Sequence, residues 1–177
     1  MNNEIILIGM SRVGKSSVGK RLAEKRKIPF FDTDTLLEKK YLKPIKEIYK
    51  EFGEARFREF EYEVFSDILK HNQKKIIATG GGIVENSKNL CLLKQNKNVV
   101  FLNADCDFIF TRILSEIDKR QESPSFLSPA GITEIDTIKS NLQELYKSRL
   151  PLYKSVANTI ITVDDKTIEM ICSEILY

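Results

Sequence analysis

The chain has 177 residues, of which 42% are hydrophobic and 30% are charged, a composition that excludes a disordered protein and predicts a globular fold with a sizeable core. The net charge is only +3, so charge gives no reason to expect a nucleic acid or a membrane as partner. Three cysteines without a paired motif and a single histidine, His71, argue against a disulfide framework, a zinc site and a multi-histidine metal centre.

No apolar run approaches the roughly 20 residues that a membrane span needs. The first residues carry neither a basic leader nor a small-residue cleavage site, so we expect no signal peptide. The cysteine usage fits a reducing compartment, and we expect a cytoplasmic protein. Because no repeat or linker divides the chain, we expect a single domain over residues 1–177.

The first predicted strand, Ile5–Ile8, leads into a phosphate-binding loop. Residues 9–16 read G-x-x-x-x-G-K-S between this strand and a helix predicted over Lys15–Lys27. The glycines allow a tight turn whose N–H groups face a phosphate, and the helix start adds partial positive charge. Lys15 would reach the β- and γ-phosphates of a nucleotide, and the Ser16 hydroxyl would hold Mg²⁺. Arg12 stands where nucleotide kinases commonly carry a small residue, and it either folds over the nucleotide or points to solvent.

A short second strand, Pro29–Phe31, is followed by two carboxylates, Asp32 and Asp34. Ligands of an open parallel sheet bind beyond the carboxyl ends of its strands, which predicts this pair beside the phosphate-binding loop. One carboxylate can face the metal, and the other can accept a hydrogen bond, and the proton, from a substrate hydroxyl. The alternative is that one of them only caps the helix that follows.

The next predicted helix, Phe57–Lys70, carries Arg58 and Glu61 on one face, three residues apart. A guanidinium group suits a substrate carboxylate, although a surface ion pair would explain the same spacing. A third strand, Lys75–Ala78, then leads to three consecutive glycines. Glycines at a strand end indicate close approach by a ligand, with a plain flexible turn as the alternative. The three glycines are Gly80, Gly81 and Gly82.

The second half of the chain continues the alternation of strands and helices. Lys119–Thr133 breaks helical periodicity and predicts a mobile surface loop. Arg149 closes a helical pattern, where it is either a solvated helix end or part of the site. The predicted strands here are Val99–Leu102 and Thr159–Val163, and the predicted helices are Ile135–Arg149 and Lys166–Leu176.

This order of elements predicts an α/β fold with three layers. Strands separated by helices require crossover connections, which give a parallel sheet covered by helices on both faces. None of the predicted strands alternates polar and apolar residues, so we expect them to be buried on both faces.

Together, these motifs resemble those of the shikimate kinase family, a group of small P-loop kinases. A P-loop alone is shared by many enzymes, but the DTD, FR-x-x-E, GGG and R-x-PLY motifs are more specific. The resemblance implies transfer of the γ-phosphoryl group of MgATP to the 3-hydroxyl of shikimate, on the way to chorismate and the aromatic amino acids. The resembling segments, in the family's order, are GMSRVGKSS, FFDTDTLLE, FGEARFREFE, ATGGGIV and SRLPLYKSVA.

The resemblance also implies the architecture and the roles of single residues. It implies a five-stranded parallel sheet, a mobile lid over about 117–133 and substrate-binding helices over about 33–62. Separately, we expect a monomer. Mg²⁺ would lie at Ser16 and Asp32. The ATP-binding residues would be Arg12, Val13, Gly14, Lys15, Ser16 and Ser17, with Arg112 against the adenine. Shikimate would bind Asp34, Arg58, Arg149, Gly80, Gly81 and Gly82, and the catalytic residues would be Lys15, Asp32 and Asp34, with Arg120 expected as a further ATP-binding and catalytic residue.

The sequence departs from the family in the lid. Members usually have an Arg-Pro pair there, and its arginine reaches the phosphates. Here Ser123 precedes Pro124, so that arginine is missing. We expect Arg120 to replace it, with Arg12 as the competing donor.

Two other functions stay open from the residues alone. The first is a P-loop kinase for another small hydroxylated acid or sugar, of the gluconate kinase type. The second is a weakly active nucleotide-binding module that regulates a partner, which Arg12 and Ser123 favour and the intact Lys15 and Asp34 oppose.

Overall fold

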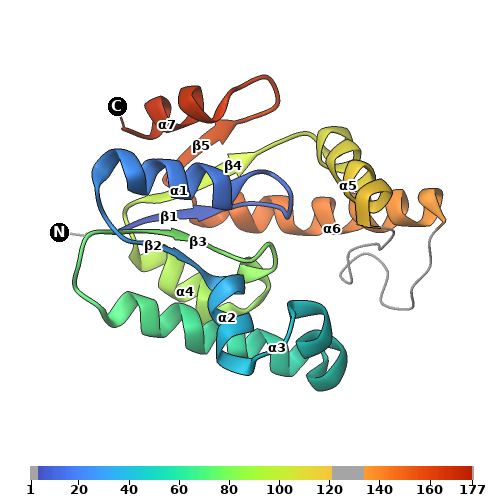
Figure 1. The fold of residues 1–177 in the computed structure, drawn as a ribbon, viewed down its shortest axis with the longest axis horizontal. Helices are drawn as coiled ribbons and strands as arrows, with labels where there is room; N and C mark the ends of the chain where they lie inside the picture. Colours follow the sequence, from blue (N-terminus) through green and yellow to red (C-terminus); the bar gives the residue numbers. More distant parts are fainter. Residues whose placement is uncertain (1–3, 121–133, 177) are drawn as a thin grey trace.

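The computed structural model describes residues 4–120 and 134–176, and within these ranges five parallel strands form one sheet (Figure 1). The strand order is β2-β3-β1-β4-β5, so the first strand lies in the centre. Ile6 of β1 is in register with Ile77 of β3 on one side and with Val99 of β4 on the other. The strands are β1 (Glu4–Ile8), β2 (Phe30–Asp32), β3 (Lys75–Ala78), β4 (Val99–Asn103) and β5 (Thr159–Thr162).

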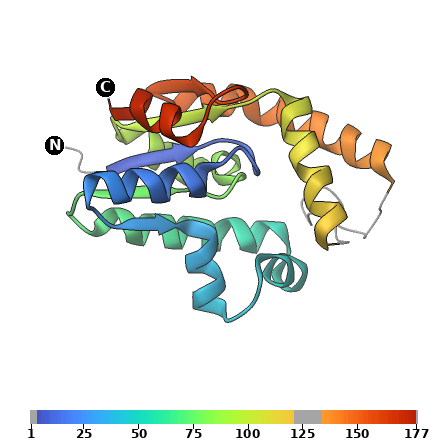
Figure 2. The ribbon, with the colours of Figure 1, turned by 45° about the horizontal axis from the view of Figure 1, so that its top comes forward.

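The helices cover both faces of the sheet, which confirms the predicted three-layer α/β fold (Figures 1 and 2). Helices α1 (Lys15–Arg26) and α7 (Ile168–Leu176) pack against each other on one face. The other face is covered by α3 (Ile45–Lys70), α4 (Ser87–Gln95) and α6 (Ile135–Val156). Among the described helices, none is both long and apolar enough to span a membrane.

The central strands are buried on both faces, as their continuous apolar sequence predicts. Ile6, Leu7 and Ile77 are completely inaccessible to solvent. The same prediction is wrong for Thr159–Val163, because β5 lies at the edge of the sheet and pairs only with β4. Three of its four residues are exposed, and the side chain of Ile160 faces solvent.

Two helices extend beyond their predicted bounds. Helix α3 starts at Ile45 rather than at Phe57, with a kink at Gly53 where φ is 74°. Helix α6 continues past the predicted end at Arg149 and runs through Pro151 to Val156. A proline removes one N–H from a helix but does not end it when the following turn is packed, and Val156 is buried in the core.

Helix α2 (Thr33–Tyr41), the one-turn helix η1 (Ile83–Glu85) and helix α5 (Cys106–Arg120) lie beyond the carboxyl ends of the strands. Figures 1 and 2 show that α2 with the start of α3, and α5 with the start of α6, extend away from the sheet on two sides of the β1–α1 loop. The predicted mobile loop and lid fall mostly on residues 121–133, outside the described residues.

Candidate active site

A cleft of about 830 Å³ lies at the carboxyl edge of the sheet. Its walls come from the phosphate-binding loop, the acidic pair after β2, the connection between α2 and α3, one face of α5, and the segment from the end of β5 into α7. The first ligand-binding motifs of the sequence therefore meet in one place, as expected for an open parallel sheet. The lining residues include Arg12, Val13, Gly14, Lys15, Ser16, Ser17, Asp32, Asp34, Gly81 and Arg112.

The phosphate-binding loop depends on two glycines for its shape. Gly9 has a φ of 143° and Gly14 a φ of 105°, both in the region that disfavours side chains. A Cβ at Gly9 would also lie 2.5 Å from the carbonyl oxygen of Leu102 on β4. Helix α1 starts at this loop with no side-chain cap from the described residues, so its first N–H groups face the cleft edge uncapped. This is the geometry that binds a phosphate.

Lys15 is buried at the start of α1 and holds the loop together. Its Nζ donates hydrogen bonds to the carbonyl oxygens of Gly9, at 2.9 Å, and of Met10, at 2.7 Å. Burial lowers the pKa of Lys15 to about 8, although the carboxylates of Asp34 and Asp32 partly oppose this shift. The ammonium group therefore lies in the cleft between the loop and the acidic pair, where a phosphoryl group would find it.

Asp32 uses its two carboxylate oxygens for different purposes. Oδ1 accepts hydrogen bonds from the N–H groups of Asp34 and Thr35, at 3.1 and 3.2 Å, and so caps α2. Oδ2 accepts a hydrogen bond from the Ser16 hydroxyl, at 2.5 Å. The capping role and the role beside the phosphate-binding loop, which the sequence presented as alternatives, are thus compatible.

Ser16 and Asp32 suit a magnesium ion that is held together with a nucleotide. Mg²⁺ in phosphoryl-transfer sites usually binds one or two protein oxygens, several waters and the substrate phosphates. One hydroxyl and one carboxylate at hydrogen-bonding distance meet this requirement. Within the described residues, no group of three or more acidic, histidine or cysteine side chains forms a self-sufficient metal site.

Asp34 is the most perturbed acid of the cleft. Burial raises its pKa to about 7, and the negative charges of Glu61 and Asp32 add to the rise, whereas Lys15 opposes it. A carboxylate that titrates near neutrality can accept a proton from an alcohol and release it again. The side chain lines the cleft beside Lys15, so the acid and the phosphate-binding ammonium act on the same space.

Arg58 and Arg149 meet in a largely buried network of two arginines and two glutamates. Arg58 Nη1 donates to Glu61, at 2.6 Å, and Arg58 Nη2 donates to Glu85. Arg149 donates from both Nε and Nη2 to Glu85, at 2.9 and 2.8 Å. Glu61 is 1% exposed and Arg149 is 3% exposed. The ion pairs of Arg58 are therefore not confined to the surface, and Arg149 is not a solvated helix end.

The three glycines after β3 join this network to the cleft. The Gly80 N–H donates to Thr33 Oγ1, at 2.9 Å, which ties the turn to α2. A Cβ on Gly82 would collide with the guanidinium of Arg58, so a larger residue there would displace this guanidinium. The carbonyl oxygen of Gly81 accepts a hydrogen bond from the hydroxyl of Tyr153, a buried side chain on α6.

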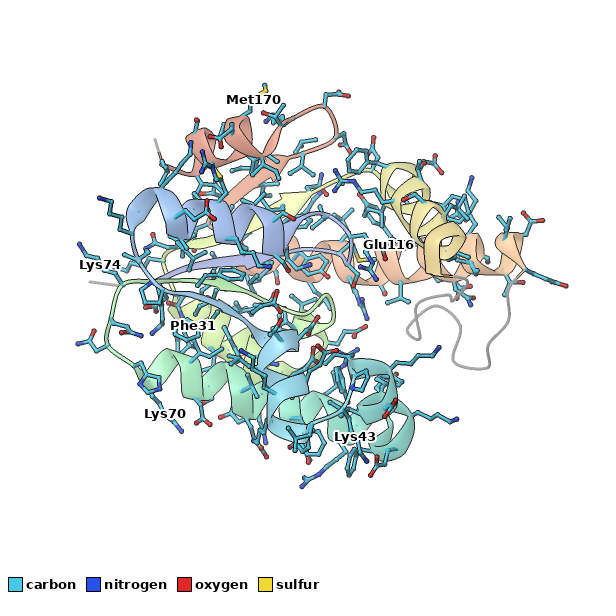
Figure 3. All side chains as sticks on the ribbon, viewed as in Figure 1. Phe31, Lys43, Lys70, Lys74, Glu116 and Met170 are labelled. Atoms are coloured by element: carbon cyan, nitrogen blue, oxygen red, sulfur yellow. The ribbon has the colours of Figure 1, made fainter. Side chains whose placement is uncertain are left out.

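Arg12 and Arg112 lie where the phosphate-binding loop meets α5. The backbone of Arg12 has a φ of 68°, which is unusual for a residue other than glycine. Its Nη2 forms an ion pair with Glu116, at 2.8 Å. Glu116, labelled in Figure 3, comes from the last turns of α5. Arg112 donates from Nη1 to the Arg12 carbonyl oxygen, at 3.0 Å, and its guanidinium lies 4.2 Å from the centre of the Phe108 ring.

The structure thus brings the predicted residues into two connected groups. The cleft contains the phosphate-binding loop, Asp32, Asp34 and Arg112, whereas Arg58, next to Gly82, and Arg149 meet at Glu85 and are not among its lining residues. Arg120 ends α5, but its side chain lies outside the described part of the chain.

Glu85 joins the site although no sequence motif predicted it. Its carboxylate accepts hydrogen bonds from both arginines. In the sequence, however, it is a single polar residue that follows the glycines and belongs to no motif. The available signal was its place three residues after Gly82, at an edge where parallel strands put ligands.

Comparison with known proteins identifies the family. A protein-family model described as shikimate kinase matches residues 11–177. The chain is 37% identical to a shikimate kinase of Staphylococcus haemolyticus, over 99% of this chain and 93% of the other. It is 41% identical to one of Lactococcus lactis subsp. cremoris, over 97% and 94%. The solved shikimate kinase of Acinetobacter baumannii in complex with shikimate superposes with a TM-score of 0.85 at 28% identity, over 98% of this chain and 90% of that one. The chain belongs to the shikimate kinase family.

Proposed function

We propose that this protein transfers the γ-phosphoryl group of ATP to the 3-hydroxyl of shikimate and forms shikimate 3-phosphate and ADP. One observation carries the proposal: a phosphate-binding loop, a carboxyl with a pKa of about 7, the buried Arg149 and the partly buried Arg58 surround the same glycine turn. Family membership supports shikimate as the acceptor and its 3-hydroxyl as the reacting group.

The nucleotide end of the reaction belongs to the phosphate-binding loop. The N–H groups of the loop and of the first turn of α1 would hold the phosphates of ATP. Lys15 would exchange its bonds to the Gly9 and Met10 carbonyl oxygens for bonds to the β- and γ-phosphates. Arg112, beside Phe108 at the cleft wall, would lie against the adenine. When bound, Mg²⁺ would neutralise phosphate charge from the position of Ser16 and Asp32.

The transfer itself requires one proton acceptor and one cation. The 3-hydroxyl oxygen of shikimate forms a bond to the γ-phosphorus, the bond from that phosphorus to the β–γ bridging oxygen breaks, and ADP leaves. Asp34 would accept the hydroxyl proton, for which a pKa of about 7 is well suited. Lys15 would stabilise the charge that develops on the γ-phosphoryl oxygens.

The carboxylate end of shikimate would be recognised by Arg58 and Arg149. Two guanidinium groups that share one carboxylate partner, Glu85, already have the spacing that a bridging carboxylate requires. The backbone of Gly80, Gly81 and Gly82 would run alongside the ring. This requirement for a carboxylate favours a hydroxylated acid over a neutral sugar as the acceptor.

The direct test is ADP release by the purified chain with MgATP and a panel of acceptors. We expect ADP release that depends on shikimate, with gluconate and neutral sugars at the level of no acceptor. ADP release with gluconate but not with shikimate would support the alternative of a gluconate-type kinase. ATP binding with no release for any acceptor would support a regulatory module. The monomeric state and the lid over about 117–133 stay predictions, which sedimentation and an enzyme with that segment shortened would test.

A further inference from the structure

Glu85 accepts hydrogen bonds from both arginines in the network. Arg149 presents Nε and Nη2 to it side by side, the bidentate geometry with which a guanidinium binds any carboxylate. Arg58 adds Nη2 to the same oxygen, Oε2. This arrangement of two guanidinium groups around one carboxylate is the arrangement proposed above for shikimate.

The positive charges of the network are already balanced without a ligand. Two arginines face Glu61 and Glu85, with the exposed Glu54 3.5 Å from Arg58 as a third carboxylate. Glu61 cannot move away, because it is 1% exposed and its Oε2 is bound to Arg58 Nη1. A substrate carboxylate added to this group would bring a further negative charge into a mostly buried space. Like charges at such short range are unfavourable when they are poorly solvated.

Glu85 is the member of the network that can leave. Its side chain is 27% exposed, compared with 2% for Glu61 and 4% for Arg149. It closes the one-turn helix η1, and the turn leads into α4 through Asn86. A rotation of the Glu85 side chain toward water would free donors on both arginines without moving the sheet or a long helix.

The arginines would keep part of their support after such a rotation. Arg58 retains its bond to Glu61. Its Nε is buried and has no hydrogen-bond partner among the described residues, so one donor is ready for an incoming group. Unpaired buried donors are costly, which gives the guanidinium a reason to bind a ligand carboxylate.

From this geometry we propose that Glu85 is an internal competitor for the substrate carboxylate: it binds Arg58 and Arg149 in the free enzyme and is displaced when shikimate binds. Glu85 then sets the affinity of this chain for carboxylate-bearing acceptors and excludes weakly binding anions. The proposal rests on the proposed function, since it takes Arg58 and Arg149 as the residues that bind the carboxylate of shikimate.

The test is calorimetric titration of shikimate into the wild-type chain, Glu85→Gln and Glu85→Ala. We expect both variants to bind shikimate at least about fivefold more tightly than the wild type, because a charged competitor is removed. The gain should appear in Kd and KM and not in kcat. The carboxamide of shikimate lacks the negative charge. Its affinity should therefore differ by less than about twofold between the wild type and the two Glu85 variants.

Glu54→Gln is the matched control. Glu54 lies 3.5 Å from the same Nη2 of Arg58, but its side chain is 61% exposed. Removing this charge should change the affinity for shikimate by less than about twofold, because water screens it. A gain of equal size in Glu54→Gln would show a general charge effect and overturn the proposal.

Weaker binding of shikimate by Glu85→Gln would also overturn it, since Glu85 would then only hold the arginines in place. If the variants unfold, a crystal structure of the wild-type chain with shikimate decides. We expect the two bonds between Arg149 and Glu85 to be broken in that complex, and their persistence would contradict the proposal. Failure of the proposed function is distinguished by the wild-type chain, which would then show no ADP release that depends on shikimate.

Discussion

The carboxyl groups of Asp34 and Glu61 converge on the space where a side chain at Gly80 would lie. A Cβ at that position would lie 2.6 Å from Asp34 Oδ1 and 2.8 Å from Glu61 Oε1. Two acids so close together in a buried space cannot both ionise readily. This proximity explains part of the rise in the pKa of Asp34 to about 7, after the larger contribution of burial.

The first prediction concerns the dependence of kcat/KM on pH. Asp34 must be ionised to accept a proton, so kcat/KM should rise with pH through about 7. Lys15 must be protonated to stabilise phosphate charge, so kcat/KM should fall as pH passes about 8. The result is a bell-shaped profile, measured at concentrations of ATP and shikimate well below KM.

Glu61→Gln identifies the acid limb of that profile. The negative charge of Glu61 raises the pKa of Asp34, so its removal should move the acid limb to lower pH and leave the alkaline limb in place. An acid limb caused by protonation of ATP in solution would not move in this variant, because the substitution does not change the pKa of free ATP. An acid limb that stays where it was would mean that a group other than Asp34 accepts the proton.

The second prediction concerns Lys15. Lys15→Met should abolish phosphoryl transfer, because the positive charge at the γ-phosphoryl group is lost, while the apolar replacement suits a buried position. Turnover and the thermal unfolding midpoint should both be measured. Lys20→Met, an exposed position on the same helix, is the control and should retain activity. A folded Lys15→Met enzyme with wild-type turnover would contradict the assignment.

The third prediction concerns Arg58. Arg58→Ala should weaken shikimate binding by about 1.5–3 kcal/mol, the contribution of a charge-assisted hydrogen bond, with a smaller effect on ATP binding. It also leaves the buried Glu61 without its partner, so thermal stability should fall as well. Arg56→Ala is the control on the same helix, since Arg56 forms an exposed pair with Glu59 and its guanidinium lies over the ring of Phe60. Equal losses of shikimate affinity in the two variants would argue against a specific role for Arg58.

The fold was predictable where local sequence determines it. The runs Ile5–Ile8 and Lys75–Ala78 are continuous and apolar, and they form the centre of the sheet. The run Thr159–Val163 is similar in composition but lies at the edge. Position in a sheet depends on pairing with distant strands, which the composition of one strand does not contain. The helix through Pro151 was missed for the same reason, because the packing of Val156 supports it.

The site shows the same division between local and distant information. The phosphate-binding loop is contiguous in the sequence, so its spacing revealed it at once. Glu85 was missed because its meaning comes from Arg58 and Arg149, which are distant in sequence and meet it only in the folded chain. The pairing of Arg12 with Glu116 is likewise invisible in the sequence, since one residue lies in the β1–α1 loop and the other on α5, about a hundred residues later.

The last prediction concerns the arginine that acts on the transferred phosphoryl group. We predict that Arg120 provides it, and that Arg120→Ala lowers turnover at saturating ATP and shikimate by at least about tenfold, since a cation there is worth roughly 10³–10⁵ in rate. Arg12 is the competitor, because it already lies in the phosphate-binding loop. Its Nη2, however, is 2.8 Å from Glu116 on α5, so Arg12 must leave that partner before it can reach a phosphate.

Three variants separate the two arginines. A loss under about threefold in Arg120→Ala, with a large loss in Arg12→Ala, would move the role to Arg12, at the scale expected for a transition-state cation. In that case Glu116→Gln should raise turnover, because it releases Arg12 from its ion pair. If Arg120 acts instead, Glu116→Gln should leave turnover unchanged, since the Arg12–Glu116 pair is partly exposed and contributes little by itself. Small losses in both arginine variants would mean that Lys15 and the loop N–H groups stabilise the phosphoryl group without a further arginine.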